Sequence, residues 1–387
     1  MPRRPTARSR ARAKSTAAPA QAGAMPRAEP ARRRGRAIWP WAIGGATVAV
    51  ALVLTLIWVL VVKSPSRLIT RAEAAAQAGD WTAALEYWRS VNATESARIG
   101  THLGEARACL ALNRAAQAER SLHRALAADP TDLEPWKLLL EILQVEDRLL
   151  EAQRLGLEAY DRVHPEARRD LLKELTQGLL AELPDELVRT TLRRWVEADG
   201  DGDDVDAQVA LWQRIAAQPR ADDPDRYSLL QSMETLLAGH PDHIGAREAL
   251  VAALADAGEP QRGRALLDEW PERARDARYW RLRGRWELEY DHRPDRAAAA
   301  FQTTVAELPQ DWRSWYRLAR ALRILGRDRE GRQAAETVSR IREVLDPLTL
   351  GPQLDAAFDH LDDPAALRNL AAICNRAGLT RLADAWR

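Results

Sequence analysis

A repeating pattern runs through the chain from residue 65 onward. Apolar residues recur at helical spacing in segments of about 12–15 residues, separated by short turns such as Gly79-Asp80 and Asp129-Pro130. The pattern repeats with a period of about 34 residues and places a small residue at a fixed offset in each segment. Because no convincing strand pattern occurs, the sequence predicts an all-α fold in which antiparallel helix pairs stack on one another.

The composition favours one elongated array of helices over several compact domains. A chain of 387 residues exceeds what one core organises, so either two or three domains or one repeat array is expected. Alanine, leucine and arginine dominate, whereas there are only 2 Phe, 6 Tyr and 3 Met residues. Stacked amphipathic helices suit this composition better than a β-rich or α/β fold, so the array is the prediction.

Two parts of the chain carry the repeat most clearly. The first part has the residues Ala106, Cys109, Ala118, Leu122, Ala125 and Pro130, and the second has Trp280, Gly284, Ala297, Phe301, Pro309, Trp315, Leu318 and Ala319. These residues resemble the tetratricopeptide repeat, whose pattern is W-x2-L-G-x2-Y, then A-x3-F, then Pro. The resemblance implies an α-solenoid whose first helices line a concave surface that binds proteins or peptides.

The resemblance also divides the chain. Tetratricopeptide-like repeats are expected at 64–166 and 244–346, and capping helices at 347–387. Residues 167–243 keep only part of the pattern and are interpreted as degenerate helical repeats, the alternative being an unrelated helical insertion. Among bacterial groups, the lipopolysaccharide-assembly repeat protein has metal-binding cysteine pairs that are absent here. The cytochrome c maturation factors, which combine a membrane span with periplasmic repeats, are a second bacterial group with this organisation, and no residue here singles them out.

A transmembrane helix is predicted at residues 37–63, before the repeats. No residue from Ala37 to Val62 is charged, and about 20 apolar residues are enough to cross a bilayer. Trp39, Trp41 and Trp58 near its two ends fit the interfaces. A cleaved signal peptide is the main alternative, but its apolar region would be shorter and would end in a small-residue cleavage site, which this run lacks.

The segment at 1–36 is expected to be a disordered basic tail, and its charge sets the orientation. Its arginines outnumber the cations after the span, so the positive-inside rule places the N-terminus in the cytoplasm of a bacterium and the repeats outside the cytoplasmic membrane. Binding of the tail to anionic lipid or nucleic acid is an alternative role for these charges. The inverse orientation would make the protein a cytoplasm-facing regulator.

The sequence offers no catalytic motif and no convincing metal site, so we expect no enzyme, no cofactor and no metal. The run Asp199–Asp204 lacks the glycine and glutamate of a calcium loop, and a solvated loop between helices with helix-capping aspartates is favoured. His240 and His243 are interpreted as turn residues. Cys109 and Cys374 lie far apart at small-residue positions, where buried free thiols are expected rather than a disulfide.

The expected activity is binding of a protein or acidic peptide, rather than nucleic acid, by a membrane-anchored scaffold. The candidate site on the concave surface consists mainly of arginines. They lie opposite the packing face in the first helix of two successive repeats, and residues near the C-terminus add to them. The site residues are Arg278, Arg281, Arg285, Arg313, Tyr316, Arg317, Arg320, Arg323, Arg368, Asn369 and Arg376. This set looks like the carboxylate-clamp use of the fold.

Two alternatives stay open for these features. The arginine side chains could form a solvated face paired with Glu287, Glu289 and Glu330. The protein could also be a structural subunit of an envelope assembly or maturation complex, with contacts through the convex face and the transmembrane helix.

Overall fold

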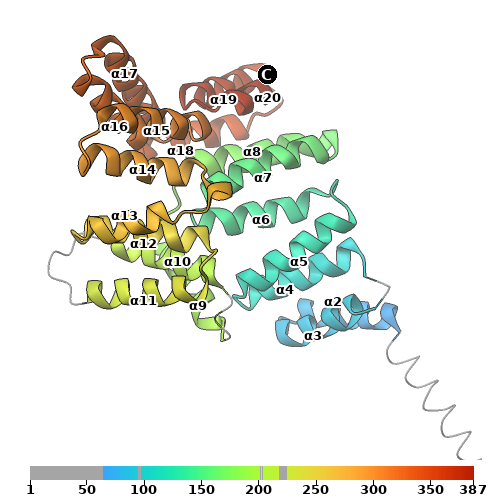
Figure 1. Ribbon diagram of the computed structural model, residues 1–387. Helices are drawn as coiled ribbons and strands as arrows, with labels where there is room; N and C mark the ends of the chain where they lie inside the picture. Colours follow the sequence, from blue (N-terminus) through green and yellow to red (C-terminus); the bar gives the residue numbers. More distant parts are fainter. Residues whose placement is uncertain (1–63, 95–96, 201, 203, 218–224) are drawn as a thin grey trace, which may run out of the picture. The chain divides into compact units, whose positions relative to one another are not determined.

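The computed structural model describes residues 64–387, except 95–96, 201, 203 and 218–224 (Figure 1). The predicted tail at 1–36 and the predicted span at 37–63 lie outside the described residues. Within the described ranges, no helix is both long enough and apolar enough to cross a membrane. All regular structure in these ranges is helical, which confirms the predicted all-α class.

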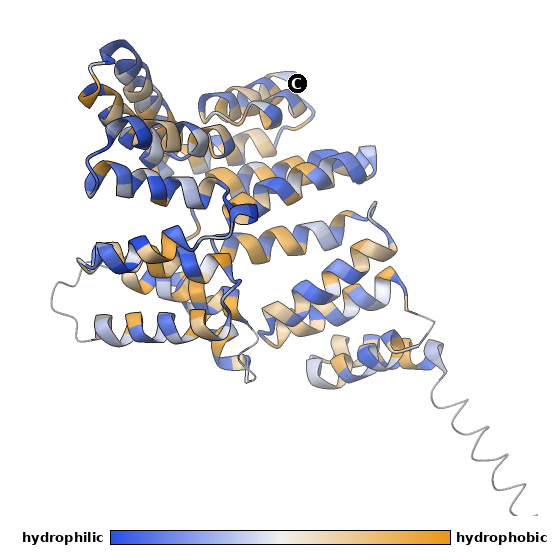
Figure 2. Ribbon diagram, in the orientation of Figure 1, coloured by the Kyte–Doolittle hydropathy of each residue, from blue (hydrophilic) through white to orange (hydrophobic). Residues whose placement is uncertain are grey.

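The described residues form a series of helices. They are α2 (Pro65–Gln77), α3 (Trp81–Asn92), α4 (Ile99–Ala111), α5 (Ala115–Ala128), α6 (Leu133–Val145), α7 (Leu149–Arg162), α8 (Arg168–Leu180), α9 (Asp185–Ala198), α10 (Val205–Ala216), α11 (Asp225–Gly239), α12 (Ile244–Asp256), α13 (Pro260–Asp268), α14 (Ala277–Glu289), α15 (Pro294–Glu307), α16 (Trp312–Ile324), α17 (Asp328–Val344), α18 (Pro347–Phe358), α19 (Pro364–Arg376) and α20 (Thr380–Ala385). Hydrophobic and hydrophilic residues alternate around most of them, as amphipathic helices require (Figure 2).

The turns within the helix pairs share one backbone conformation. A residue with positive φ follows the first helix of the pairs α2–α3, α4–α5, α6–α7, α12–α13, α14–α15, α16–α17 and α19–α20; these residues are Gly79, Asn113, Asp147, Gly258, His292, Gly326 and Gly378. A left-handed residue at this place ends a helix and lets the chain reverse. Four of the seven are glycine, which adopts this conformation without strain.

The small residues singled out in the sequence lie inside the helix pairs. Ala106 of α4 and Ala118 and Ala125 of α5 are each 0% exposed, so all three face the interior of this pair. Gly284 of α14 serves the same purpose at its pair, because a Cβ at this position would lie 2.8 Å from Cε1 of Phe301 on α15. Small side chains at these positions let the paired helices approach closely.

The middle of the chain departs from simple pairing. Helix α8 packs on α6 and α7, whereas α9 packs mainly on α10 and α11 packs on α12. The interpretation of 167–243 as degenerate repeats stays a prediction.

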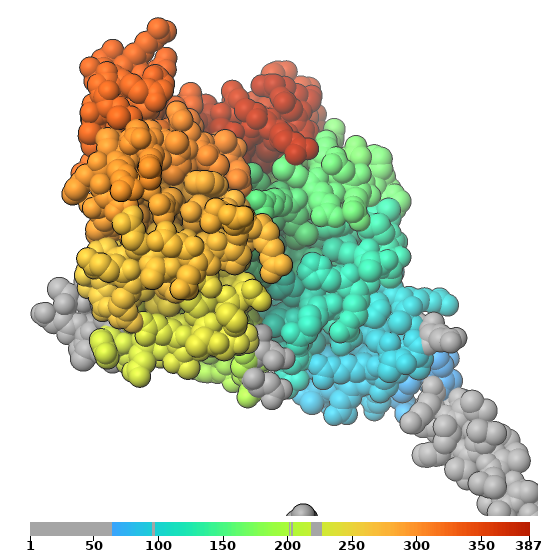
Figure 3. Space-filling view, viewed as in Figure 1, coloured from blue at the N-terminus to red at the C-terminus, as the bar shows by residue number. Residues whose placement is uncertain are grey.

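The last three helices pack back on the middle of the chain as well as on α17. One cluster of buried residues joins α8 to α18, α19 and α20. The indole of Trp386 is 2% exposed and donates a hydrogen bond from Nε1 to Oγ1 of Thr176 on α8, 2.9 Å away. In Figure 3 the C-terminal helices, in red, lie directly against the green helices. Residues 347–387 therefore join α8 to the last full helix pair.

Candidate partner-binding face and charged centre

The arginines predicted on α14 are paired with carboxylates of the chain itself. Arg278 donates to Glu151 of α7 over 3.1 Å and to Asp276, the N-cap of α14, over 2.8 Å. The contact with Glu151 spans 127 positions of sequence, so no local pattern could have revealed it. Arg278 therefore joins α14 to α7.

The other two predicted arginines of α14 hold it against α12. Arg281 donates to Glu248 at 2.5 Å, and Arg285 donates to Asp256 at 2.6 Å. Burial opposes the charged form of Arg281, but the carboxylates of Glu248 and Asp311 outweigh burial and raise its pKa. These guanidiniums are committed to contacts between helices.

The arginines of α16 have a different environment. Arg313 stacks on the ring of Trp312, with its guanidinium carbon 4.8 Å from the ring centroid. No carboxylate of the described residues forms an ion pair with Arg313 or Arg320, and both side chains are exposed. Tyr316 lies between them and is 54% exposed. This half of the predicted face presents cations and an aromatic ring to solvent.

The remaining predicted residues are divided between the two environments. Arg317 of α16 forms an ion pair with Glu289 at 3.5 Å, and the exposed Arg323 donates from Nε to a carbonyl of its own helix. Arg368 and Asn369 are exposed on α19, and no hydrogen bond or ion pair in the described part of the chain links them to α16. Arg376 of α19 forms an ion pair with Glu343 at 3.0 Å.

The glutamates of the alternative interpretation do pair with arginine. Glu287 contacts Arg283 at 2.8 Å and Glu330 contacts Arg327 at 2.5 Å, while Glu289 contacts the arginines already described. Glu287 is only 2% exposed, so its pair belongs to the interior and not to a solvated face.

Helix α6 carries the opposite charge on the face that corresponds to that of α16. Trp136 of α6 and Trp315 of α16 occupy the same place, because each indole donates at 2.9 Å to the carbonyl of a proline six residues earlier. Counting from these tryptophans, α6 has Glu134 and Glu141 where α16 has Arg313 and Arg320. The fold therefore accepts either charge here, and the arginines of α16 are not a packing requirement.

A cluster of charges that no sequence pattern indicated lies where α5, α6, α7 and α10 meet, and in it Glu146 is buried while the other members are half-buried. Arg148 contacts Glu146 at 2.8 Å, Glu151 at 2.7 Å, Glu119 at 3.1 Å and Asp206 at 3.6 Å. Its members come from separate elements, so neither spacing nor motif pointed to it. We call Arg148 and these four carboxylates the charged centre.

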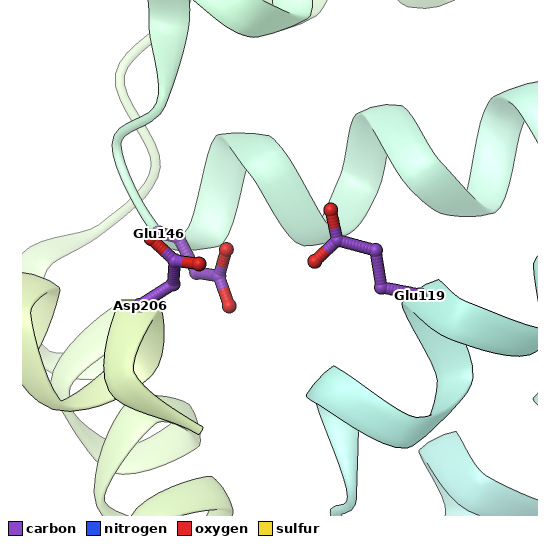
Figure 4. A group of neighbouring side chains, drawn as sticks. All are labelled: Glu119, Glu146 and Asp206. Carbon is purple, nitrogen blue, oxygen red and sulfur yellow. The ribbon is translucent and has the colours of Figure 1, made fainter. Parts of the chain in front are cut away.

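Three of the carboxylates approach one another closely enough to bind a metal ion. One oxygen each from Glu119, Glu146 and Asp206 lies within 4.8 Å of the others, and Figure 4 shows the carboxylates around a common space. The guanidinium of Arg148 already contacts all three and supplies a positive charge to the cluster. The cluster is explained as an internal ion-pair network without a metal.

Burial and pairing shift the pKa values of these carboxyl groups in opposite directions. Burial raises the pKa of Glu146 well above its usual value, despite the contact with Arg148. Burial acts in the same sense on Glu119, but hydrogen bonds and charge from His123 and Arg148 outweigh it and lower the pKa. The charged centre therefore favours the protonated form of Glu146 and the ionised form of Glu119.

Asp204 of the acidic run and His243 take structural roles beside this centre. Asp204 is 4% exposed and accepts backbone N–H groups of Ala207 and Ala116, both at 3.1 Å. It therefore caps α10, as the favoured interpretation predicted, but it is buried instead of solvated. His243 caps α12 by accepting the N–H of Ala246 at Nδ1, so Nε2 carries the proton toward Asp206, 3.2 Å away.

Both cysteines are free and buried, as expected from the sequence. Burial raises the pKa of Cys109 to about 11 and that of Cys374 to about 12. Thiols in this state are poor nucleophiles and poor metal ligands.

Stacked antiparallel helix pairs, with small residues between paired helices and left-handed turns, define a helical-repeat protein. Residues 75–143 and 219–285 match the tetratricopeptide repeat family. These two stretches together therefore carry tetratricopeptide repeats, which confirms the resemblance seen in the sequence. No curated protein matches the sequence.

Several solved structures align with this chain at low identity and low TM-score. A tetratricopeptide repeat protein from Parabacteroides merdae is 14% identical, with 67% of this chain and 99% of that chain covered and a TM-score of 0.31. The APC/C hetero-tetramer Cut9–Hcn1 is 13% identical, with 84% of this chain and 78% of that chain covered and a TM-score of 0.33. The human IFIT1 dimer with PPP-AAAA is 15% identical, with 77% of this chain and 68% of that chain covered and a TM-score of 0.35. These similarities concern the fold alone.

Proposed function

We propose that this protein is a membrane-anchored tetratricopeptide scaffold, not an enzyme, that binds an acidic segment of a protein partner on the exposed face of α16. The proposal depends on one observation. Arg313 and Arg320 flank the exposed Tyr316 and have no carboxylate partner among the described residues, whereas the arginines of α14 are all paired.

The charge of α16 supports an acidic partner. Residues 312–327 contain the five arginines Arg313, Arg317, Arg320, Arg323 and Arg327 and no aspartate or glutamate. Guanidinium groups donate paired hydrogen bonds to carboxylates in a fixed geometry. The neighbouring Tyr316 adds an aromatic surface of the kind that anchors interfaces. Arg368 and Asn369 of α19 remain candidates for a second, separate contact.

The predicted span at 37–63 supplies the anchor in this proposal, with the repeats on the extracytoplasmic side of the bacterial cytoplasmic membrane. Alkaline phosphatase and fluorescent-protein fusions at residue 387 test the orientation. We expect phosphatase activity without cytoplasmic fluorescence, and the reverse result would favour the cytoplasm-facing regulator. A partner that stays bound in fixed stoichiometry through detergent extraction would favour the structural subunit of an envelope complex.

Binding on α16 is tested with the full chain in detergent and a fluorescent polyglutamate peptide. We expect Arg313→Glu combined with Arg320→Glu to weaken binding at least about tenfold, because an attraction becomes a repulsion. Added salt should weaken wild-type binding. The matched control reverses Arg193 and Arg194, two exposed arginines of α9. Equal binding by wild type and the α16 variant would eliminate this face.

A further inference from the structure

The chain itself carries an acidic surface of the kind that the α16 face should bind. Residues 346–363 contain five aspartates and no lysine or arginine. Asp346 and Asp363 accept backbone N–H groups as the N-caps of α18 and α19. Asp355 and Asp359 are exposed and form no ion pair within the described residues, so their charges are available.

Apolar side chains accompany the charges on both surfaces. Leu348 of α18 is 85% exposed, more than any other large hydrophobic residue of the described chain. On α16, Tyr316 and Ile324 are 54% and 57% exposed. Each surface therefore combines charge with exposed apolar side chains, which is the composition of a protein interface.

Helices α16 and α18 both contribute residues to one groove, but no ion pair of the described residues joins them. A groove of about 740 Å³ is lined by Trp312 from α16, Arg342 from α17, and Pro347 and Thr349 from α18. Arg342 is held at one wall by stacking on Trp312, 5.1 Å from the ring centroid. No ion pair in the described part of the chain joins α16 to α18. The charges of α16 and α18 therefore do not satisfy each other within one copy.

We infer that the acidic segment bound by α16 is α18 of a second copy of this chain, in a two-fold symmetric dimer. The inference rests on the proposed function, because it names the partner of the α16 face. A two-fold pair places α16 of each copy on α18 of the other and so forms the contact twice. Anchoring of both copies in one membrane raises their effective concentration.

Charge exchange tests the dimer in the full chain in detergent by sedimentation equilibrium. The first variant carries Arg313→Glu and Arg320→Glu, and the second carries Asp355→Lys and Asp359→Lys. In a dimer of either variant alone, like charges face each other at both α16–α18 contacts. We therefore expect the dimer dissociation constant to rise at least about tenfold. In a mixture, both contacts between the two variants again join opposite charges. We expect differently tagged copies of the two variants to copurify.

The remaining outcomes separate this inference from the proposed function. Reversal of Arg193 and Arg194 on α9 should leave the dimer unchanged. A chain that stays monomeric at all concentrations but still binds polyglutamate on α16 would overturn the dimer and leave the proposed function standing. A chain that neither dimerises nor binds polyglutamate would overturn both the dimer and the proposed function. A dimer that persists in each variant, or two variants that fail to copurify, would also overturn the inference.

Discussion

At the scale of single residues, the charged centre contains more negative than positive charge. Arg148 is shared by four carboxylates, and the side chain of Glu146 is only 1% exposed. One guanidinium cannot fully stabilise four neighbouring carboxylates, so protonation of one of them lowers the electrostatic cost. Glu146, with its raised pKa, is the group best placed to hold that proton.

Replacing Glu146 by glutamine tests this assignment. Because the pKa in the fold lies above the unfolded value of about 4.3, the proton on Glu146 favours the fold. Its contribution to stability is fully present below the unfolded pKa and is lost as pH rises through the folded pKa. Glutamine resembles the protonated acid, so we expect Glu146→Gln to retain or raise the free energy of unfolding at pH 7. Urea denaturation from pH 4 to 8 measures it.

The partner of Glu146 provides the contrasting variant. Arg148→Met leaves the four carboxylates without their common cation, and removing one partner of a buried ion pair costs about 3–5 kcal/mol. We therefore expect a large loss of stability at pH 7 for Arg148→Met and none for Glu146→Gln. If both variants lose stability equally, Glu146 is ionised in the fold.

At the scale of elements, the helix pairs could be predicted from the sequence because their determinants are local. Helical periodicity, a small residue inside the pair and a turn residue after the first helix all lie within one repeat. The partners of the arginines could not be predicted in this way. Arg285 and Arg320 lie at the same distance after Trp280 and Trp315, but Arg285 forms an ion pair with Asp256 of α12, while Arg320 stays exposed.

Glycine in the α14–α15 pair provides a test of the packing. A Cβ on residue 284 would lie 2.8 Å from the ring of Phe301, which is itself 0% exposed and has little room to move. We expect Gly284→Ala to lower the free energy of unfolding by about 1–3 kcal/mol, the usual cost of overpacking. Gly100 of α4 is the matched control, since nothing lies within 4 Å of its added Cβ.

Alanine favours helix over glycine, so Gly100→Ala should raise stability by about 0.5–1 kcal/mol. Opposite signs in denaturant unfolding of the two variants would support the close contact of α14 with α15. A Gly284→Ala variant as stable as wild type would contradict it.

At the scale of the whole described unit, contacts between distant parts of the chain add to the stacking of neighbours. Gln153 of α7 donates to the carbonyl of Glu307 at the end of α15, 3.1 Å away. The residues Leu150, Ala277 and Leu308 form a small apolar cluster beside this contact. These contacts are few and partly polar, whereas those between α8 and the last three helices form a continuous apolar cluster.

Trp386 is the residue whose removal best tests the contact of α20 with α8. Its buried indole fills the space between the two helices, and truncation of a buried tryptophan costs about 3–5 kcal/mol. Trp386→Phe keeps most of the volume but removes the N–H that Thr176 accepts, so its cost should be smaller. We expect Trp386→Ala to lower the melting temperature of the full chain and to speed amide exchange in α8 as well as in α20. Faster exchange in α20 alone would mean that α8 does not depend on the C-terminal helices for its stability.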